Sequence, residues 1–248
     1  MPARIAIGLL VLLAGCGRTP RRAGTEVIVA AAANLTDVFG RVGPAFQSQT
    51  GIHPVFSFAS TAQLTRQIEN SAPFDVFTAA DSAHVARLEH EGLLDHRAVY
   101  ARGVLALWVP PGSRGKIERL EDLRSPQVRS IALAKPELAP YGQAAMESLA
   151  RLGIWDLVKP RVIYAENISM ARQYGASGNA DAVFTAYSLV LHAEGKVIRV
   201  DPKLHNPIDQ ELGVVTHSKN RDAAQKFVDF LLRGNGKTIL GQYGYGTP

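Results

Sequence analysis

VIVAAAANLTDVFGRVGPAF, residues 27–46, is the stretch that decides the fold. Its first seven residues are a continuous apolar run, which predicts a buried strand. The apolar residues after Asn34 recur at helical spacing and predict a helix that ends at Gly51. They are Leu35, Val38, Phe39, Val42 and Phe46. A buried strand that turns directly into a helix is the repeating unit of an α/β protein.

The same alternation continues along the chain. Further strands are expected at 53–59, 75–80, 104–110, 130–134, 161–165, 181–187, 196–200 and 211–218. Helices are expected at 61–71, 82–94, 120–125, 142–153, 167–178 and, as one long segment, 223–244. This alternation predicts an α/β fold with mainly parallel sheets.

The N-terminal residues have the features of a signal peptide. Arg4 precedes the apolar run IAIGLLVLLAG, which is short for a membrane span and is followed directly by Cys16. The ending Leu13-Ala14-Gly15-Cys16 resembles a bacterial lipobox, where the cysteine thiol receives a diacylglycerol and becomes the mature N-terminus. We predict a lipoprotein signal peptide at 1–15, lipidation of Cys16 and a flexible tether at 16–25. The alternative is an ordinary secretory signal with an incidental cysteine.

Composition excludes several classes of function. The chain has 248 residues and a formal net charge of +5, but no basic stripe interleaved with aromatic residues, so no nucleic-acid partner is expected. Cys16 is the only cysteine, which excludes a disulfide framework and a cysteine-rich metal site. The seven histidines form no H-E-x-x-H pair, and G-x-S-x-G is absent from the sequence.

Four strand-to-helix junctions carry small or hydroxyl residues. They are Ala33-Asn34, Ser60-Thr61, Pro140-Tyr141-Gly142 and Asn167-Ile168-Ser169. Ligands of open α/β sheets bind beyond the carboxyl ends of strands. Helix N-termini there offer unpaired N–H groups and a positive dipole end, so several of them can hold an anion without Lys or Arg. Simple helix capping explains any one junction alone, and Asn34 with Asp37 resembles a capping box.

Several blocks resemble the molybdate-binding proteins of ABC importers, the ModA type of substrate-binding protein. The blocks are VIVAAAANLTDVF, FASTAQLTRQIENSAPFDVFTAAD, KPELAPYGQAA, the segment around Asn167-Ile168 and a C-terminal helix ending in QYGY. The second block is the most specific, because a hydroxyl-bearing turn, Gln67-Ile68, Ala72-Pro73, Asp75 and Ala80-Asp81 follow in order. The resemblance runs from about residue 27 to 246.

The resemblance implies a two-lobed periplasmic-binding-protein fold of type II, in which each lobe is a mainly parallel sheet flanked by helices. Its lobes close on a bare oxyanion held by hydroxyl and backbone N–H groups. Lobe 1 is expected at 26–103 and 212–248, and lobe 2 at 104–211.

Carried over residue by residue, the resemblance places the ligand site at Asn34, Ser60, Thr61, Tyr141 and Ile168. Ile168 would act through its backbone N–H, and no direct metal ligands are implied. Some members add a strand tyrosine, but the matching position here is Ala186. Tyr187 would face the other way by strand alternation and is left out.

The sequence therefore predicts a binding protein, not an enzyme, that captures molybdate and tungstate for an ABC permease. No cofactor is expected, and the protein is expected to be a monomer on the periplasmic or extracytoplasmic face, anchored to the membrane through Cys16. One rival is a binding protein for another oxyanion such as sulfate. The other is a hydrolase that uses Asp75 or Asp81, although capping by Asp81 explains that residue more simply.

Overall fold

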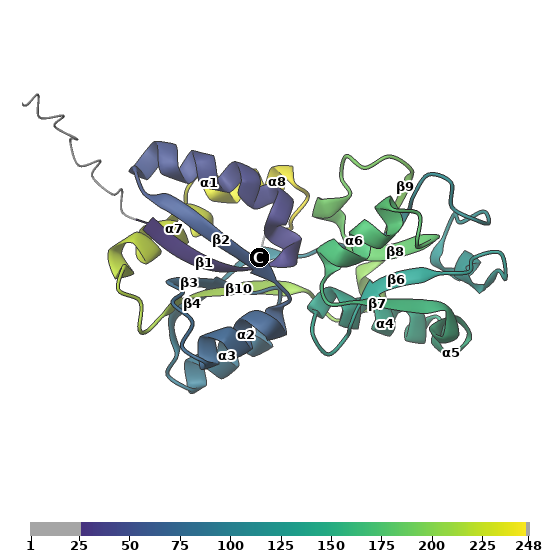
Figure 1. Cartoon of the computed structure of the whole chain (residues 1–248), viewed down its shortest axis with the longest axis horizontal. Coiled ribbons are helices and arrows are strands. Elements are labelled where there is room, and N and C mark those ends of the chain that lie inside the picture. Colours follow the sequence, from purple (N-terminus) through teal and green to yellow (C-terminus); the bar gives the residue numbers. More distant parts are fainter. Residues whose placement is uncertain (1–25, 247–248) are drawn as a thin grey trace, which may run out of the picture.

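The computed structural model describes residues 26–246, in two lobes that lie side by side (Figure 1). The predicted signal peptide, the lipidation at Cys16 and the tether lie outside the described residues. Each lobe contains one five-stranded sheet. None of the helices within residues 26–246 has the length and apolar character needed to cross a membrane.

The sheet of lobe 1 has the strand order β2-β1-β3-β10-β4. Its strands are β1 (Glu26–Ala32), β2 (His53–Ala59), β3 (Val76–Thr78), β4 (Leu94–Arg102) and β10 (Asp209–Val215). β1 pairs in parallel with β2 and β3, whereas β10 is antiparallel to β3 and β4. The apolar β1 therefore lies inside the sheet, in agreement with the burial of most of its residues.

Helices cover both faces of this sheet (Figure 1). Val27, Val29 and Ala31 of β1 pack in one cluster with α1 (Thr36–Thr50), α7 (Arg221–Leu232) and α8 (Asn235–Gln242). Ala30 points to the opposite face and packs with α2 (Thr61–Glu69) and α3 (Ala83–His90). Successive residues of one apolar strand thus supply both cores of lobe 1.

The sheet of lobe 2 has the order β7-β6-β8-β5-β9. Its strands are β5 (Leu105–Val109), β6 (Ile131–Ala134), β7 (Val162–Ala165), β8 (Ala182–Ala186) and β9 (Lys196–Arg199). Its helices are α4 (Pro140–Arg151), α5 (Trp155–Val158) and α6 (Ile168–Ala176). Short 3-10 turns lie at Ala33–Leu35, Leu120–Arg124, Lys159–Arg161, Tyr187–Leu189 and Pro202–Leu204. Helices α4 and α6 lie on opposite faces of the sheet (Figure 1).

Two crossings join the lobes. The chain leaves lobe 1 between Arg102 and Leu105 and returns where β10 begins at Asp209. At this return, Asp209 pairs with Arg102 of β4.

The predicted two-lobed fold is confirmed, and three details differ. Each sheet is mixed, with two parallel and two antiparallel pairings. β4, at a sheet edge, was not predicted, because its polar residues Asp95-His96-Arg97 interrupt the apolar pattern that would indicate a strand. The single helix predicted at 223–244 is two helices: α8 folds back over Phe230, where a Cβ on Gly236 would lie 2.7 Å from the Phe230 carbonyl oxygen.

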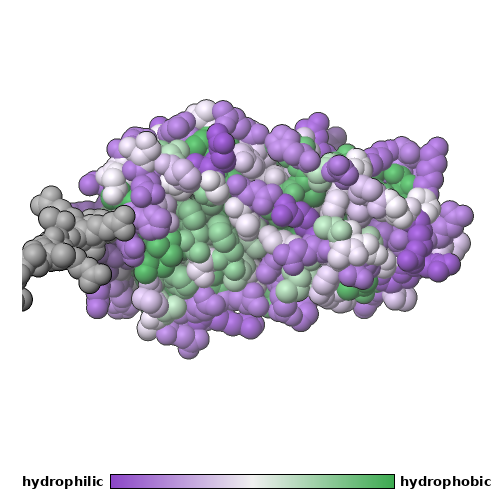
Figure 2. Space-filling view, turned by 45° about the horizontal axis from the view of Figure 1, so that its top comes forward, coloured by the Kyte–Doolittle hydropathy of each residue, from purple (hydrophilic) through white to green (hydrophobic). Residues whose placement is uncertain are grey.

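The other edge of the lobe 1 sheet exposes apolar side chains. Val55 and Phe58 of β2 are 38% and 37% exposed. Figure 2 shows apolar surface gathered on the lobe at the left, while much of the visible surface elsewhere is hydrophilic.

Candidate functional site

The five predicted site residues line one cavity between the lobes. Its lining comprises Ala32, Ala33, Asn34, Ser60, Thr61, Ala80, Ala139, Pro140, Tyr141, Asn167 and Ile168. These residues follow the carboxyl ends of β1, β2, β3, β6 and β7. Four junctions that are far apart in the sequence therefore meet at one place, as expected for an α/β ligand site.

Helix N-termini supply the main-chain donors. Thr61 and Ile168 are the first residues of α2 and α6, and Tyr141 follows Pro140 at the start of α4. N–H groups at these positions have no acceptor within their own helix. They also lie at the positive end of each helix dipole, so an anion in the cavity would be stabilised.

Thr61 and Ser60 have different roles. The Thr61 Oγ1 accepts a hydrogen bond from the Ala80 N–H at 3.2 Å, which leaves its hydroxyl proton free to donate into the cavity. The Ser60 hydroxyl donates to the Gln63 Oε1 at 2.8 Å, and the same oxygen accepts from the Ser60 N–H at 3.2 Å. Ser60 is therefore the N-cap residue of α2 with its hydroxyl proton engaged by Gln63, while Thr61 keeps a donor for a ligand.

Asn34 is not a helix cap. The N-cap of α1 is Leu35, which makes no side-chain cap bond, so the predicted capping box of Asn34 and Asp37 is wrong. The Asn34 Nδ2 instead donates to the Gln210 Oε1 at 2.8 Å and to the Tyr245 hydroxyl at 3.0 Å. Asn34 is only 1% exposed, so this amide is fixed inside the molecule. Asn167 does cap α6, because its Oδ1 accepts from the Met170 N–H at 3.0 Å.

The Tyr141 hydroxyl is turned toward the crossing between the lobes. It accepts a hydrogen bond from the Gln210 Nε2 at 2.8 Å. Burial, with a smaller contribution from the neighbouring Tyr245 hydroxyl, raises the pKa of Tyr141 well above its ordinary value. Burial likewise raises the pKa of Tyr245. Both hydroxyls therefore stay protonated and neutral at physiological pH.

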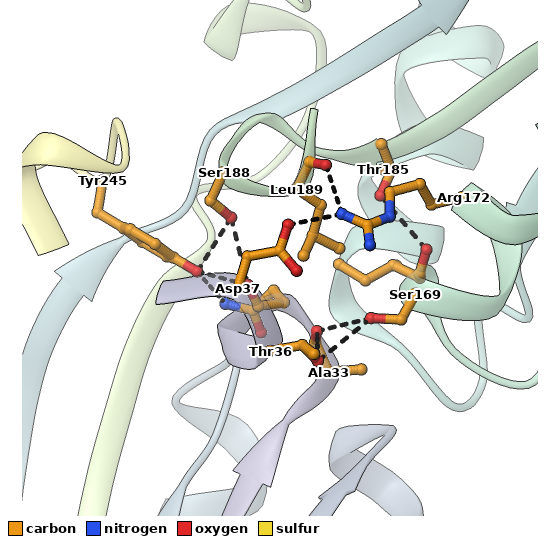
Figure 3. Close-up of polar contacts among 11 residues, drawn as sticks. Ala33, Thr36, Asp37, Ser169, Arg172, Thr185, Ser188, Leu189 and Tyr245 are labelled. Atoms are coloured by element: carbon orange, nitrogen blue, oxygen red, sulfur yellow. Dashed lines mark hydrogen bonds and ion pairs between the residues drawn. The ribbon is translucent and has the colours of Figure 1, made fainter. Parts of the chain in front are cut away.

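Contacts across the cleft hold the two lobes together, several of them drawn in Figure 3. The Ser169 Oγ donates to the Ala33 carbonyl oxygen at 2.9 Å. The Ser188 Oγ donates to the main-chain oxygen of Asn34 at 3.2 Å and lies 3.1 Å from the Tyr245 hydroxyl. The lobes are therefore closed over the cavity.

The charged groups near the cavity are paired with one another. The Asp37 Oδ2 lies 2.6 Å from the Arg172 Nη1, and the Glu166 Oε1 lies 2.6 Å from the Lys135 Nζ. The two carboxylates at these helix ends are thus satisfied by ion pairs rather than by backbone or water alone. Across residues 26–246, the cavity lining contains no ionisable side chain except the neutral Tyr141. Binding there has to rely on hydrogen-bond donors and helix dipoles.

Comparison with known proteins agrees with this geometry. The model of a bacterial extracellular solute-binding protein family matches residues 27–246. The chain belongs to this family.

Within the family, the relatives of this solute-binding protein include ModA proteins. The molybdate-binding protein ModA of Azotobacter vinelandii is 35% identical, over 97% of this chain and 98% of the relative. ModA of Rhodobacter capsulatus is 32% identical, over 99% of this chain and 98% of that relative. The solved periplasmic molybdate-binding protein of Azotobacter vinelandii matches with a TM-score of 0.85 and 28% identity, covering 90% of this chain and 100% of that one. The resemblance to ModA-type proteins is confirmed.

The two carboxylates of the hydrolase alternative have structural partners in this solute-binding protein. Asp75 accepts from the Ile28 N–H at 2.7 Å and from the Ser218 hydroxyl at 2.6 Å. Asp81 accepts from the His84 N–H at 2.9 Å in the first turn of α3, as its predicted capping role requires. Asp75 precedes β3, at the end of the sheet remote from the cavity.

Sequence reasoning missed the residues that surround the site of this solute-binding protein. Gln210, Tyr245 and Ser188 contact the site residue Asn34 from other elements. Only Tyr245 carried a sequence signal, through the C-terminal QYGY block. Tyr187, left out of the prediction, does not line the cavity, and its ring lies 5.6 Å from the Arg199 guanidinium.

Proposed function

We propose that this solute-binding protein captures molybdate, and also tungstate, and delivers the oxyanion to a membrane-embedded ABC permease. One observation supports this proposal above all: Asn34, Thr61, Tyr141 and Ile168 line a single cavity that contains donors and no basic side chain. The identity with ModA proteins over almost the whole chain supports the choice of molybdate.

The proposed contacts divide between main chain and side chain. Thr61 would donate through its hydroxyl, whose oxygen is already occupied by the Ala80 N–H. Ile168 and Tyr141 would donate through their N–H groups at the starts of α6 and α4. Asn34 would add a side-chain contact from lobe 1. Ser60 would support the site through its hydrogen bonds to Gln63 at the start of α2 rather than by touching the ligand.

The chemistry of the ligand fits such a site. Molybdate and tungstate are fully ionised at neutral pH and only accept hydrogen bonds. A cavity lined by donors and helix N-termini satisfies such an ion without burying an opposite charge. The two lobes would each supply part of the donor set, so binding favours the closed arrangement.

The cell location follows from the N-terminal pattern. A lipid on Cys16 would hold the protein on the extracytoplasmic face of a membrane, beside the permease that receives the ligand. The two acyl chains of the diacylglycerol make the anchoring stable, and amide-linked acylation of the new N-terminus would add a third chain. We propose a monomer, since each chain carries a complete cavity.

Thermal unfolding with a panel of oxyanions tests the function. A ligand that binds only the folded state raises the melting temperature by mass action. Molybdate and tungstate should raise it at concentrations where sulfate and phosphate do not. Assays for hydrolysis of phosphate and carboxylate esters should run in parallel. Stabilisation by sulfate alone, or steady turnover of an ester, would disprove the proposed function.

A further inference from the structure

A buried polar network lies behind the cavity and is centred on Gln210. Gln210 belongs to β10 and is 0% exposed. Its Oε1 accepts from the Asn34 Nδ2 at 2.8 Å and from the Tyr100 hydroxyl at 2.8 Å, and its Nε2 donates to the Tyr141 hydroxyl at 2.8 Å. This one amide therefore contacts a cavity residue of each lobe, Asn34 from lobe 1 and Tyr141 from lobe 2.

The donors and acceptors of this arrangement do not balance. Tyr100 has one hydroxyl proton but two acceptors, the Ala79 carbonyl oxygen at 3.0 Å and the Gln210 Oε1. The Tyr141 hydroxyl proton meets no acceptor among residues 26–246. The Asn34 Oδ1 is buried and has no hydrogen-bond partner in the same described residues. Buried polar groups without partners are costly, so all three defects need an explanation.

Turning over the two amides removes the defects at Tyr100 and Tyr141 and replaces the unpartnered Asn34 oxygen with an unpartnered amide nitrogen, a donor that a ligand can satisfy. The nitrogen and oxygen of a side-chain amide occupy equivalent positions, so the change exchanges donor for acceptor and moves no other group. The Gln210 Nε2 then donates to the Tyr100 hydroxyl and to the Asn34 Oδ1, and the Gln210 Oε1 accepts from Tyr141. Tyr100 donates its single proton to Ala79. The hydroxyls of Tyr245 and Ser188 can still form hydrogen bonds with Asn34, since each lies within 3.2 Å of the Asn34 main-chain oxygen or side-chain amide.

We propose that Gln210 is a positioning residue that holds the Asn34 amide with its nitrogen turned into the cavity, where it donates to the bound oxyanion. The buried and unpartnered amide atom of Asn34 lies opposite Gln210, and Asn34 lines the cavity. In the arrangement before reversal, that atom is an oxygen that would repel an anion. The inference rests on the proposed function, since it concerns how the same site recognises its oxyanion.

The same arrangement assigns the role of Tyr141. Its hydroxyl proton goes to the Gln210 Oε1, so Tyr141 serves the ligand through its main-chain N–H. Gly103, in the crossing between the lobes, leaves the space for this contact. A Cβ at Gly103 would collide with the Tyr141 hydroxyl and lie 2.8 Å from the Gln210 Nε2. The network thus also couples the crossing of the chain to the orientation of the Asn34 amide.

A double-mutant cycle tests the coupling between Gln210 and Asn34. Molybdate affinity is measured by calorimetry for wild-type protein, Gln210→Met, Asn34→Ala and the double variant. Gln210→Met should weaken binding about tenfold to a hundredfold, because it removes the donor that fixes the Asn34 oxygen. In the Asn34→Ala background the same change should cost less than about twofold. Gln143→Met is the matched control, since Gln143 is half-buried on α4 and donates to Glu147 instead.

Neutron diffraction from the deuterated wild-type complex with molybdate tests the orientation without any variant. Deuterium on the Asn34 amide should point at a molybdate oxygen, and deuterium on Gln210 should face Asn34 and Tyr100. Deuterium of Gln210 facing Tyr141, or equal effects of Gln210→Met in both backgrounds, would overturn the inference while molybdate binding stands. If wild-type protein binds sulfate and not molybdate, the proposed function fails, and the same measurements with sulfate decide the role of Gln210.

Discussion

The Oδ2 of Asp37, in the first turn of α1, lies 2.6 Å from the Nη1 of Arg172 on α6, and this ion pair joins lobe 1 to lobe 2. Arg172 also donates from Nη1 to the Leu189 carbonyl oxygen at 2.8 Å, which fixes the guanidinium on lobe 2. Both side chains of the pair are about one-third exposed, at 32% and 34%. The pair therefore lies where water and salt reach it once the lobes part (Figure 3).

Arg172→Met should favour the open form. An exposed ion pair stabilises by only about 0.2–1 kcal/mol, so molybdate affinity should fall less than about fivefold. The loss should shrink at high salt, which screens the wild-type pair. Calorimetry at low and high salt measures this, and X-ray scattering should show a larger radius for the variant at the same ligand concentration. Arg66→Met is the control, since Arg66 is exposed on α2 and makes no ion pair within residues 26–246. A salt-independent loss would contradict the role of the pair in closure.

Thr61→Val should weaken molybdate binding much more than Thr61→Ser. Valine lacks the hydroxyl donor and leaves a ligand oxygen unpaired, at a cost of about 1–3 kcal/mol or roughly tenfold to a hundredfold in affinity. Valine also leaves the Ala80 N–H without its acceptor, so the ligand-free melting temperature should fall as well. Ile168→Ala keeps its N–H and should bind nearly as well as wild type. Equal losses for Thr61→Val and Ile168→Ala in calorimetry would refute this division of donors.

Phosphate should bind weakly. Hydrogen phosphate carries a proton that needs an acceptor, and no ionised carboxylate lines the cavity in the described part of the chain. Sulfate passes this test but is smaller than molybdate, and donors fixed on packed helices cannot move inward to follow it. Tungstate is nearly the size of molybdate and should compete closely. Competition calorimetry at fixed pH and ionic strength ranks the four ions. If phosphate or sulfate bound as tightly as molybdate, the arguments from the missing acceptor and from the size of the ion would both be contradicted.

The stability of lobe 2 should depend on pH through Asp181. Burial alone would raise the pKa of this carboxyl, but the N–H groups of Arg114, Arg129 and Ser130 donate to it and hold its pKa below the ordinary value. A carboxyl whose pKa is lower in the folded state stabilises the protein at pH values above its unfolded pKa, which is about 3.9 for Asp. This stabilisation is lost as the pH falls through the pKa of the folded state. The melting temperature should therefore drop in acid.

Asp181→Asn isolates that contribution. The variant should be less stable at neutral pH by about 1–3 kcal/mol, because the amide nitrogen cannot accept from the main-chain donors. Its melting temperature should vary less with pH below about 4 than that of wild type. Molybdate affinity at neutral pH should not change, since Asp181 is not part of the cavity lining. If the melting temperature of the variant fell in acid as much as that of wild type, carboxyl groups other than Asp181 would be responsible for the pH dependence.

Cys16→Ser should abolish lipidation, since serine has no thiol to receive the diacylglycerol. The variant should remain a precursor or be released in soluble form, whereas wild type should partition with membranes. Mass spectrometry of the mature N-terminus is the measurement. Wild-type protein that begins at another residue, without added lipid mass, would show that the N-terminal stretch is an ordinary secretory signal.

The site residues could be predicted from the sequence where the features that position them lie nearby in the chain. Thr61 and Ile168 begin helices directly after polar caps and apolar strands, so residues within a few positions specify their N–H groups. The surroundings of Asn34 were not predictable, because its partners Gln210 and Tyr245 lie 176 and 211 positions away. Capping is the simplest local explanation of an asparagine there, but tertiary contacts override it. For the same reason the sequence did not reveal β4, which is held by β10 rather than by an apolar run of its own.

The place of β10 in the lobe 1 sheet determines the order in which the molecule can fold. β10 lies between β3 and β4 but is made only after the whole of lobe 2, whose five strands run without interruption from Leu105 to Arg199. During synthesis the second lobe can complete its sheet while the first still lacks an inner strand. Until β10 arrives, β3 has an unpaired edge, which is a hazard for association with other chains. Closing so long a loop also raises contact order, so we expect completion of lobe 1 to be the slow step of folding.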